Sequence, residues 1–199
     1  MIYLIIFLAV ILVGFAVLIF LRKLQFDAVH NNFLDIVDRY GGKVVRGGFA
    51  VRPRYTGSYR NNNVSISISA EKREKNKPRQ FFISLFYQSA ANANFTVMAK
   101  DWLKLQNGKN QKNRIFKNVG NEKYVLEVTE KELMNQLDIP GIEEQVLKLD
   151  PFAYVLVSKK GILLERLSTN LIADTEFRHM EVLLDGVYEL SRLNEKKPL

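Results

Sequence analysis

The stretch that decides the fold is residues 64–70, VSISISA, in which apolar and small hydroxyl side chains alternate. Strict alternation is typical of a β-strand with one buried and one solvent-exposed face. Residues 81–87, FFISLFY, are apolar at almost every position and predict a second strand, buried on both faces. Residues 95–99 indicate a third strand. We therefore expect residues 43–117 to form an antiparallel β meander.

Downstream of this region the sequence predicts a mixture of helices and strands. Residues 124–128 alternate like a strand. A capping-box pattern at residues 129–132 begins a short helix, and Pro140 begins another that ends near Asp150. Residues 153–167, AYVLVSKKGILLERL, predict a β-hairpin with its turn at Lys159-Lys160-Gly161. The fold class expected from this order is α+β, with helices packed on an antiparallel sheet.

A final helix is predicted over residues 174–194, because its apolar residues recur at helical spacing. Gly186 lies within this pattern, where glycine costs about 1 kcal/mol relative to alanine. We expect it to mark a place where the helix crosses a strand at close range.

Residues 1–21, MIYLIIFLAVILVGFAVLIFL, carry no charged side chain and are long enough to cross the hydrocarbon core of a bilayer. The alternative, a cleaved signal peptide, calls for a basic start and a small-residue cleavage site that this stretch lacks. Arg22 and Lys23 follow the apolar segment directly. By the positive-inside rule we expect a single-pass protein of the cell (inner or plasma) membrane, with its N-terminus outside and its C-terminal domain cytoplasmic.

Residues 22–42 predict an amphipathic juxtamembrane helix that ends at Gly41-Gly42. Its stripe consists of Phe26, Val29, Phe33, Ile36, Val37 and Tyr40. The stripe is expected to pack against the chain's own domain, and the alternative is a homodimer through a short coiled coil. The domains expected are thus an anchor (1–21), this stalk (22–42) and one cytoplasmic α+β domain (43–199). A straight stalk would lift that domain about 25 Å from the membrane.

Charge is unevenly distributed along the chain. The whole sequence has a net charge of +8. Residues 41–118 hold 16 Lys and Arg against three acidic residues, whereas residues 119–199 hold 10 basic and 15 acidic residues. The β region is therefore expected to present a basic surface beside a mildly acidic C-terminal part.

The densest candidate for binding an anion or a partner is residues 52–60, RPRYTGSYR. Arginines and tyrosines at this spacing can grip a phosphate or a carboxylate. The alternative interpretation is a turn between strands whose arginines face water. The candidate binding residues are Arg46, Arg52, Arg54, Tyr55, Tyr59 and Arg60.

The sequence contains no recognised catalytic motif. It has no cysteine and only two histidines, His30 and His179, so thiol chemistry is excluded and no cofactor is predicted. Each histidine follows an acidic residue by three positions, but two such pairs separated by a β-rich region do not make a metal site, and none is predicted. Whether the protein is an enzyme is left open, and a non-enzymatic function is favoured.

Three functions remain. The first is a membrane-anchored binding or assembly module whose basic β face meets an acidic protein in a membrane complex or anionic lipid headgroups. The second is a membrane-bound enzyme acting on an anionic or lipid substrate, which calls for a deep pocket with perturbed acidic groups. The third is nucleic-acid binding, suggested by aromatic rings such as Trp102 and Phe82 among the basic residues, although no signature motif accompanies them.

Overall fold

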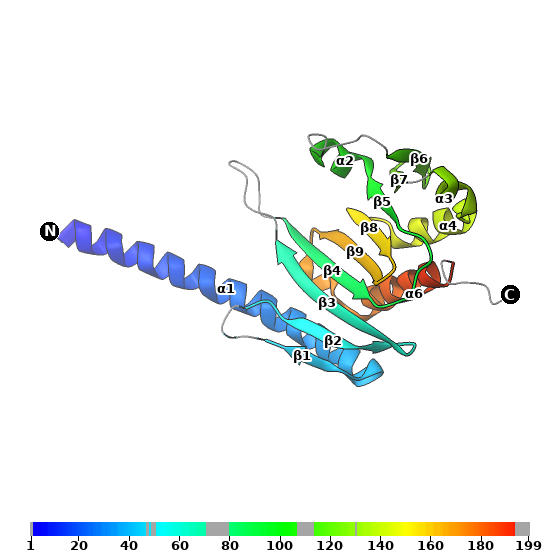
Figure 1. Cartoon of the computed structure of the whole chain (residues 1–199). Helices are drawn as coiled ribbons and strands as arrows, with labels where there is room; N and C mark the ends of the chain where they lie inside the picture. Colours follow the sequence, from blue (N-terminus) through cyan, green and yellow to red (C-terminus); the bar gives the residue numbers. More distant parts are fainter. Residues whose placement is uncertain are drawn as a thin grey trace.

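The computed structural model of the chain describes residues 2–46, 48, 51–70, 80–106, 114–129 and 131–193. The strands are β1 (Lys43–Val45), β2 (Arg54–Tyr59), β3 (Asn62–Ala70), β4 (Phe81–Tyr87), β5 (Phe95–Ala99), β6 (Ile115–Val119), β7 (Tyr124–Val128), β8 (Tyr154–Ser158) and β9 (Gly161–Ser168). The helices are α1 (Ile2–Tyr40), α2 (Lys100–Gln106), α3 (Lys131–Gln136), α4 (Ile139–Leu149), α5 (Leu171–Asp174) and α6 (Phe177–Leu193). The predicted α+β fold with one soluble domain is confirmed (Figure 1).

The nine strands of the described residues form one antiparallel sheet in the order β1-β2-β3-β4-β9-β8-β5-β7-β6. The predicted meander is confirmed from β1 to β4. Strand β5 does not continue it, because the C-terminal hairpin of β8 and β9 lies between β4 and β5. The strands of this hairpin are largely apolar, so it is more stable in the centre of the sheet than at an edge.

Residues 54–59 form a strand, which corrects the interpretation of this stretch as a turn. Strand β2 pairs with β3 from Arg54↔Ser67 to Tyr59↔Asn62. The turn follows at Arg60 and Asn61, whose φ angles are +49° and +68°. Two consecutive positive φ angles are typical of the tight turns that join antiparallel strands.

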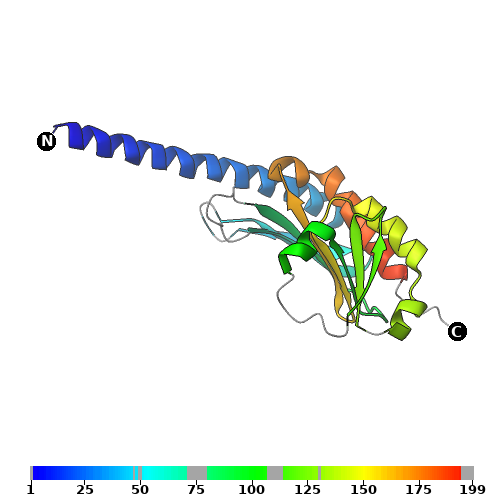
Figure 2. The same cartoon turned by 90° about the horizontal axis from the view of Figure 1, so that it is seen from above.

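Helices cover one face of the sheet. The end of α1 and helices α4 and α6 lie on this face, and α2 lies on the other (Figure 2). Side chains at alternate positions of the central strands point into the helix-covered core and are fully buried, including Ile66, Ile83, Leu164, Val155 and Leu126. Their neighbours point to the opposite face, which α2 covers only in part and which we call the uncovered face; on it Phe86 and Leu156 are each more than a third exposed.

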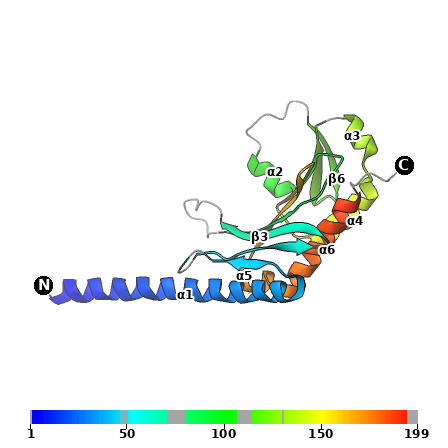
Figure 3. The same cartoon turned by 60° about the horizontal axis from the view of Figure 1, so that its bottom comes forward.

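Anchor and stalk form one continuous helix, α1. Phe26, Val29, Phe33 and Ile36 are fully buried, so the expected packing of the stripe against the chain's own domain is confirmed. Asn32 adds a hydrogen bond from its side-chain nitrogen to the carbonyl oxygen of Ile172, at 2.8 Å. The start of the helix projects from the domain, and it is long and apolar enough to cross a membrane (Figure 3).

The domain lies beside the stalk rather than beyond its end (Figure 3). Strands β1 and β2 both contact α1, and the buried stripe begins at Phe26, five residues after Leu21. The expectation that a straight stalk lifts the domain by about 25 Å is therefore corrected: the first residue packed on the domain lies five residues beyond Leu21, a rise of about 7.5 Å.

Gly186 marks a close crossing, but with a helix rather than with the expected strand. A Cβ atom at this position would lie 2.7 Å from Cδ2 of Leu149, in α4. Helices α4 and α6 pack through this contact because glycine lets them approach. The predicted loops at 71–78 and 107–113, together with Glu130 of the capping box, lie outside the described residues.

Candidate binding site on the uncovered face of the sheet

The structure places Arg46 and Arg52 at the end of the sheet nearest the anchor. We call this end, formed by Arg46, Arg52, Ile68 and Phe81, the anchor-proximal end. The guanidinium of Arg46 forms an ion pair with Asp27 of α1. That of Arg52 donates to the carbonyl oxygen of Ile68 at 3.5 Å and lies 5.9 Å from the ring centre of Phe81.

Two cations converge on Asp27. Lys23 donates to its carboxylate at 2.7 Å, and Arg46 contacts the other oxygen. The hydrogen bond from Lys23, and then that from Arg46, hold the pKa of Asp27 below its ordinary value. Phe26 meets Phe81 edge to face with 6.5 Å between ring centres, which joins the same turn of α1 to the start of β4. The anchor-proximal end is thus held firmly against the first turns of the stalk.

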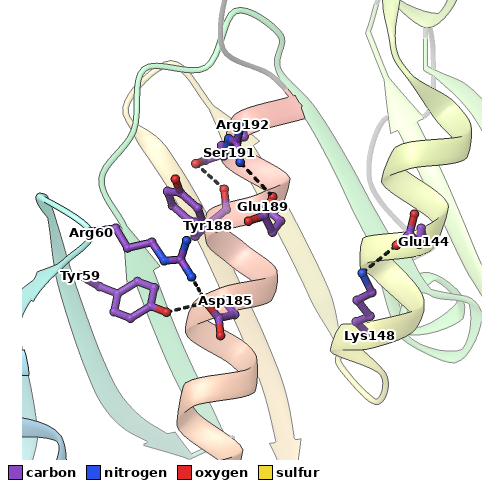
Figure 4. A network of polar contacts seen from close by, with 9 residues as sticks. All are labelled: Tyr59, Arg60, Glu144, Lys148, Asp185, Tyr188, Glu189, Ser191 and Arg192. Carbon is purple, nitrogen blue, oxygen red and sulfur yellow. Dashed lines mark hydrogen bonds and ion pairs between the residues drawn. The ribbon is translucent and has the colours of Figure 1, made fainter. Parts of the chain in front are cut away.

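Tyr59 and Arg60 belong to a network with α6 (Figure 4). The hydroxyl of Tyr59 donates to Asp185 Oδ1 at 2.5 Å, and Arg60 Nη2 donates to the same oxygen at 2.8 Å. The Arg60 guanidinium also lies 4.3 Å from the ring centre of Tyr188. Burial, and then the hydrogen bond to Asp185, raise the pKa of Tyr59. These contacts tie the β2–β3 turn to the last helix.

Tyr55 and Arg54 are neighbours in β2 that point to opposite faces. The ring of Tyr55 is buried, and its hydroxyl donates to the carbonyl oxygen of Gly41 at 2.9 Å, which secures the end of α1. Arg54 is exposed on the uncovered face, opposite Ser67 and Val45. The six candidate residues therefore lie in separate places, namely the anchor-proximal end, the contact with α6, the end of α1 and the uncovered face.

A cavity of about 240 Å³ lies on the uncovered face, near the middle of the sheet. Its walls include the rings of Phe82 in β4, Trp102 in α2 and Tyr154 in β8, and Glu165 of β9 lies between the two strands. Ring centres are 5.6 Å apart for Phe82 and Trp102, and 6.3 Å apart for Trp102 and Tyr154. Further cavities, of about 310 and 200 Å³, border the other sides of Trp102.

Glu165 is the carboxylate of this cavity. Its Oε1 accepts a hydrogen bond from the Ser84 hydroxyl at 2.6 Å. Burial raises the pKa of Glu165, and burial followed by the nearby Glu165 charge raises the pKa of Tyr154. The cavity therefore combines three aromatic rings with a partly desolvated carboxylate.

A second carboxylate, Glu127 of β7, also points to this face. It is 8% exposed and pairs with Arg114 at 2.7 Å. Glu127 and Glu165 are three strands apart in the sheet, or about 14 Å at ordinary strand spacing. Paired catalytic carboxylates of glycosidases lie less than about 10 Å apart. This arrangement suits binding better than two-carboxylate catalysis, and the described residues hold no cluster of three or more His, Asp or Glu for a metal ion.

Glu165 is not among the site residues predicted from the sequence, and Trp102 and Phe82 were predicted only as part of a nucleic-acid interface. One signal was available for Glu165. It lies between Leu163 and Leu167 at strand alternation, so this pattern places a lone charge among apolar side chains on one face of the strand. Nothing in the sequence indicated that α2 would place Trp102 over that face, because α2 follows β5 and not β9.

No protein-family model matches the chain, and no curated protein matches it in sequence. Among solved structures, it is similar to the crystal structure of the mycobacterial trehalose monomycolate transport factor A. The identity is 13%, the match covers 83% of this chain and 86% of the other, and the TM-score is 0.42. A likeness of this degree establishes no shared function.

Proposed function

We propose that the protein is a single-pass membrane protein whose cytoplasmic domain is a non-enzymatic binding module, held against the membrane so that its anchor-proximal end engages anionic lipid headgroups. The observation that carries this proposal is the ion pair between Arg46 and Asp27, which fixes a basic part of the sheet beside the start of the stalk.

The distances suit contact with headgroups. Asp27 lies six residues beyond Leu21, a rise of about 9 Å along α1. The polar headgroup layer extends about 5–7 Å beyond the hydrocarbon core, and charges interact strongly within the Debye length of about 8 Å at physiological salt. Arg46 is thus held close to the depth at which anionic headgroups lie.

Basic side chains gather where the proposal places the anionic headgroups. Arg22 and Lys23 end the apolar segment, and Arg46 and Arg52 lie at the anchor-proximal end. Asp27 accepts from both Lys23 and Arg46, so its single negative charge faces two of these cations. Each cation near an anionic leaflet contributes about 1 kcal/mol. The rigid, fully buried packing of Phe26 keeps the cations at this depth without a further ordering cost.

The test uses the full-length protein in nanodiscs. Because the chain has no cysteine, a single Val45→Cys substitution accepts a spin label next to Arg46, where Val45 is 51% exposed. The readout is its collision with a paramagnetic chelate attached to lipid headgroups. We expect the collision rate to rise several-fold when phosphatidylglycerol is added to neutral discs, and Arg46→Gln with Arg52→Gln to remove most of that rise.

Lys159→Gln with Lys160→Gln is the matched control, since it removes the same charge from the β8–β9 turn at the opposite end of the sheet. Equal collision rates in neutral and anionic discs would overturn the lipid proposal. A second outcome would also overturn it. If the unsubstituted protein captures an acidic protein from native membranes and the Arg46→Gln with Arg52→Gln variant does not, the ligand is that protein and not lipid.

A further inference from the structure

The cavity over Glu165 has the composition of a site for an organic cation. Phe82 is 6% exposed, and Trp102 and Tyr154 are partly buried, so the three rings are partly withdrawn from water and line a cavity that stays open to solvent on one side. Aromatic faces attract cations through their quadrupole, and this attraction grows as water is excluded. The rings come from β4, α2 and β8, so the walls depend on the tertiary fold.

The charge at this cavity is uncompensated within the described residues. Glu165 accepts from Ser84, but no described lysine, arginine or histidine forms an ion pair with it. A partly desolvated carboxylate without a cation is costly, and a bound cation would remove much of that cost.

We propose that the cavity formed by Phe82, Trp102, Tyr154 and Glu165 binds a methylated ammonium group, such as the trimethylammonium head of choline. Methylation matters because a primary ammonium carries three donors that all need acceptors. A trimethylammonium group needs none, and it presents methyl groups to the rings and charge to the carboxylate. The volume of about 240 Å³ leaves room for this group.

This site is independent of the proposed lipid contact. It uses none of the four cations assigned to headgroup binding, and it attracts the opposite charge. The same chemistry can come from a soluble molecule or from a phosphatidylcholine headgroup, so the experiment has an arm for each source.

The experiment uses the intrinsic fluorescence of the full-length protein in maltoside micelles, because Trp102 is the chain's only tryptophan. Tetramethylammonium chloride is titrated against sodium chloride at equal ionic strength. We expect a saturable change with tetramethylammonium and none with sodium. The neutral choline analogue 3,3-dimethylbutanol should bind at least tenfold more weakly, and equal binding would overturn the proposal.

Glu165→Gln should weaken tetramethylammonium binding about tenfold or more, while Glu144→Gln, on the exposed surface of α4, should leave it unchanged. Phe82→Leu keeps apolar bulk but removes a ring, and we expect a several-fold loss; it serves as the second variant should Glu165→Gln not fold. Unchanged binding in a folded Glu165→Gln or Phe82→Leu variant would overturn the proposal.

Whether the methylated ammonium group belongs to a lipid or to a soluble molecule is tested in phosphatidylglycerol nanodiscs with and without phosphatidylcholine. Competition by phosphatidylcholine against tetramethylammonium identifies a lipid headgroup as the ligand. Binding that is unaffected by phosphatidylcholine identifies a soluble cation. Failure of tetramethylammonium to bind in either disc overturns the cation site, whatever the labels at Val45 report about the lipid contact.

Discussion

The two faces of the sheet are built from the same strands, yet one carries stability and the other carries the candidate chemistry. On the covered face, Leu85 is fully buried beneath the helices, whereas its neighbour Phe86 on the uncovered face is 37% exposed. The covered face buries aliphatic side chains together with rings such as those of Tyr55 and Tyr87, as the hydrophobic effect favours. The uncovered face keeps aromatic rings, hydroxyls and a carboxylate in partial contact with water. Stability and binding are thus separated by the alternation of a single sheet.

The largest effect is expected where the stalk helix joins the covered face. Phe33 is fully buried in α1, and its replacement by alanine should cost about 3–5 kcal/mol of unfolding free energy. Leu34, the next residue, is 40% exposed and gives the matched control. The unfolding free energies of Phe33→Ala and Leu34→Ala are measured by urea unfolding of the full-length protein in micelles, with circular dichroism as the signal. Equal losses in Phe33→Ala and Leu34→Ala would contradict the packing of the stalk on the sheet.

A smaller effect is expected at Asp150, at the edge of the covered core. Its carboxylate accepts from the hydroxyl of Tyr124 and from Lys123, at 3.1 Å for Lys123, and the bond from Tyr124 is the first cause of its lowered pKa. Asp150→Asn should cost about 2 kcal/mol near neutral pH.

The same group predicts a pH dependence. Because the folded pKa of Asp150 lies below its ordinary value of 3.8, its stabilisation is complete above that value and is lost as the pH falls through the lower folded pKa. Urea unfolding at a series of pH values should show stability falling below about pH 4, less steeply in Tyr124→Phe. Identical slopes in the two proteins would contradict this assignment.

The next smaller loss of stability is expected at Gly186, where helices α4 and α6 cross. Alanine would gain about 1 kcal/mol of helix propensity, but its Cβ would lie 2.7 Å from Leu149 Cδ2, and overpacking costs about 1–3 kcal/mol. We expect a net loss of about 1 kcal/mol in Gly186→Ala. A double-mutant cycle with Leu149→Ala should show favourable coupling between the two substitutions. Additive losses would mean that the two helices do not touch through this pair.

The smallest effect is expected on the uncovered face. Phe86→Ala should cost at most about 1 kcal/mol, because its ring is already partly hydrated. Leu85→Ala on the same strand should cost about 2–5 kcal/mol. Thermal unfolding of the two variants compares the faces directly. A loss in Phe86→Ala as large as that in Leu85→Ala would contradict the exposure of the Phe86 ring.

Much of the local structure could be predicted from side-chain periodicity. The alternation at residues 64–70 and the stripe from Phe26 to Tyr40 were sufficient, because a buried face imposes its period on the sequence. Strand β2 was not predicted as a strand. Its residues, RYTGSY, include a glycine and several polar side chains, so they are equally typical of a turn.

The candidate binding residues were harder to predict. Arginines and tyrosines close together in sequence suggested one anion site, but alternation sends Arg54 and Tyr55 to opposite faces, and the tyrosine hydroxyls bind Gly41 and Asp185 within the fold. The rings around Glu165 belong to residues that are 11 to 83 positions distant from it in the sequence. No local pattern encodes such a site, because its members share a place in the sheet and not a stretch of chain.

The sequence by itself determined the membrane-length apolar helix, the amphipathic stalk and the strands with the clearest alternation, since each depends on the hydrophobicity of neighbouring residues. Only the tertiary structure decided that the C-terminal hairpin lies at the centre of the sheet, that the domain lies beside the stalk, and that Trp102 covers Glu165. These features depend on which apolar surfaces meet. The hydrophobic effect stabilises the burial of any apolar surface and does not select which surfaces meet. The pairing of surfaces is decided by close packing between segments that are distant in the sequence.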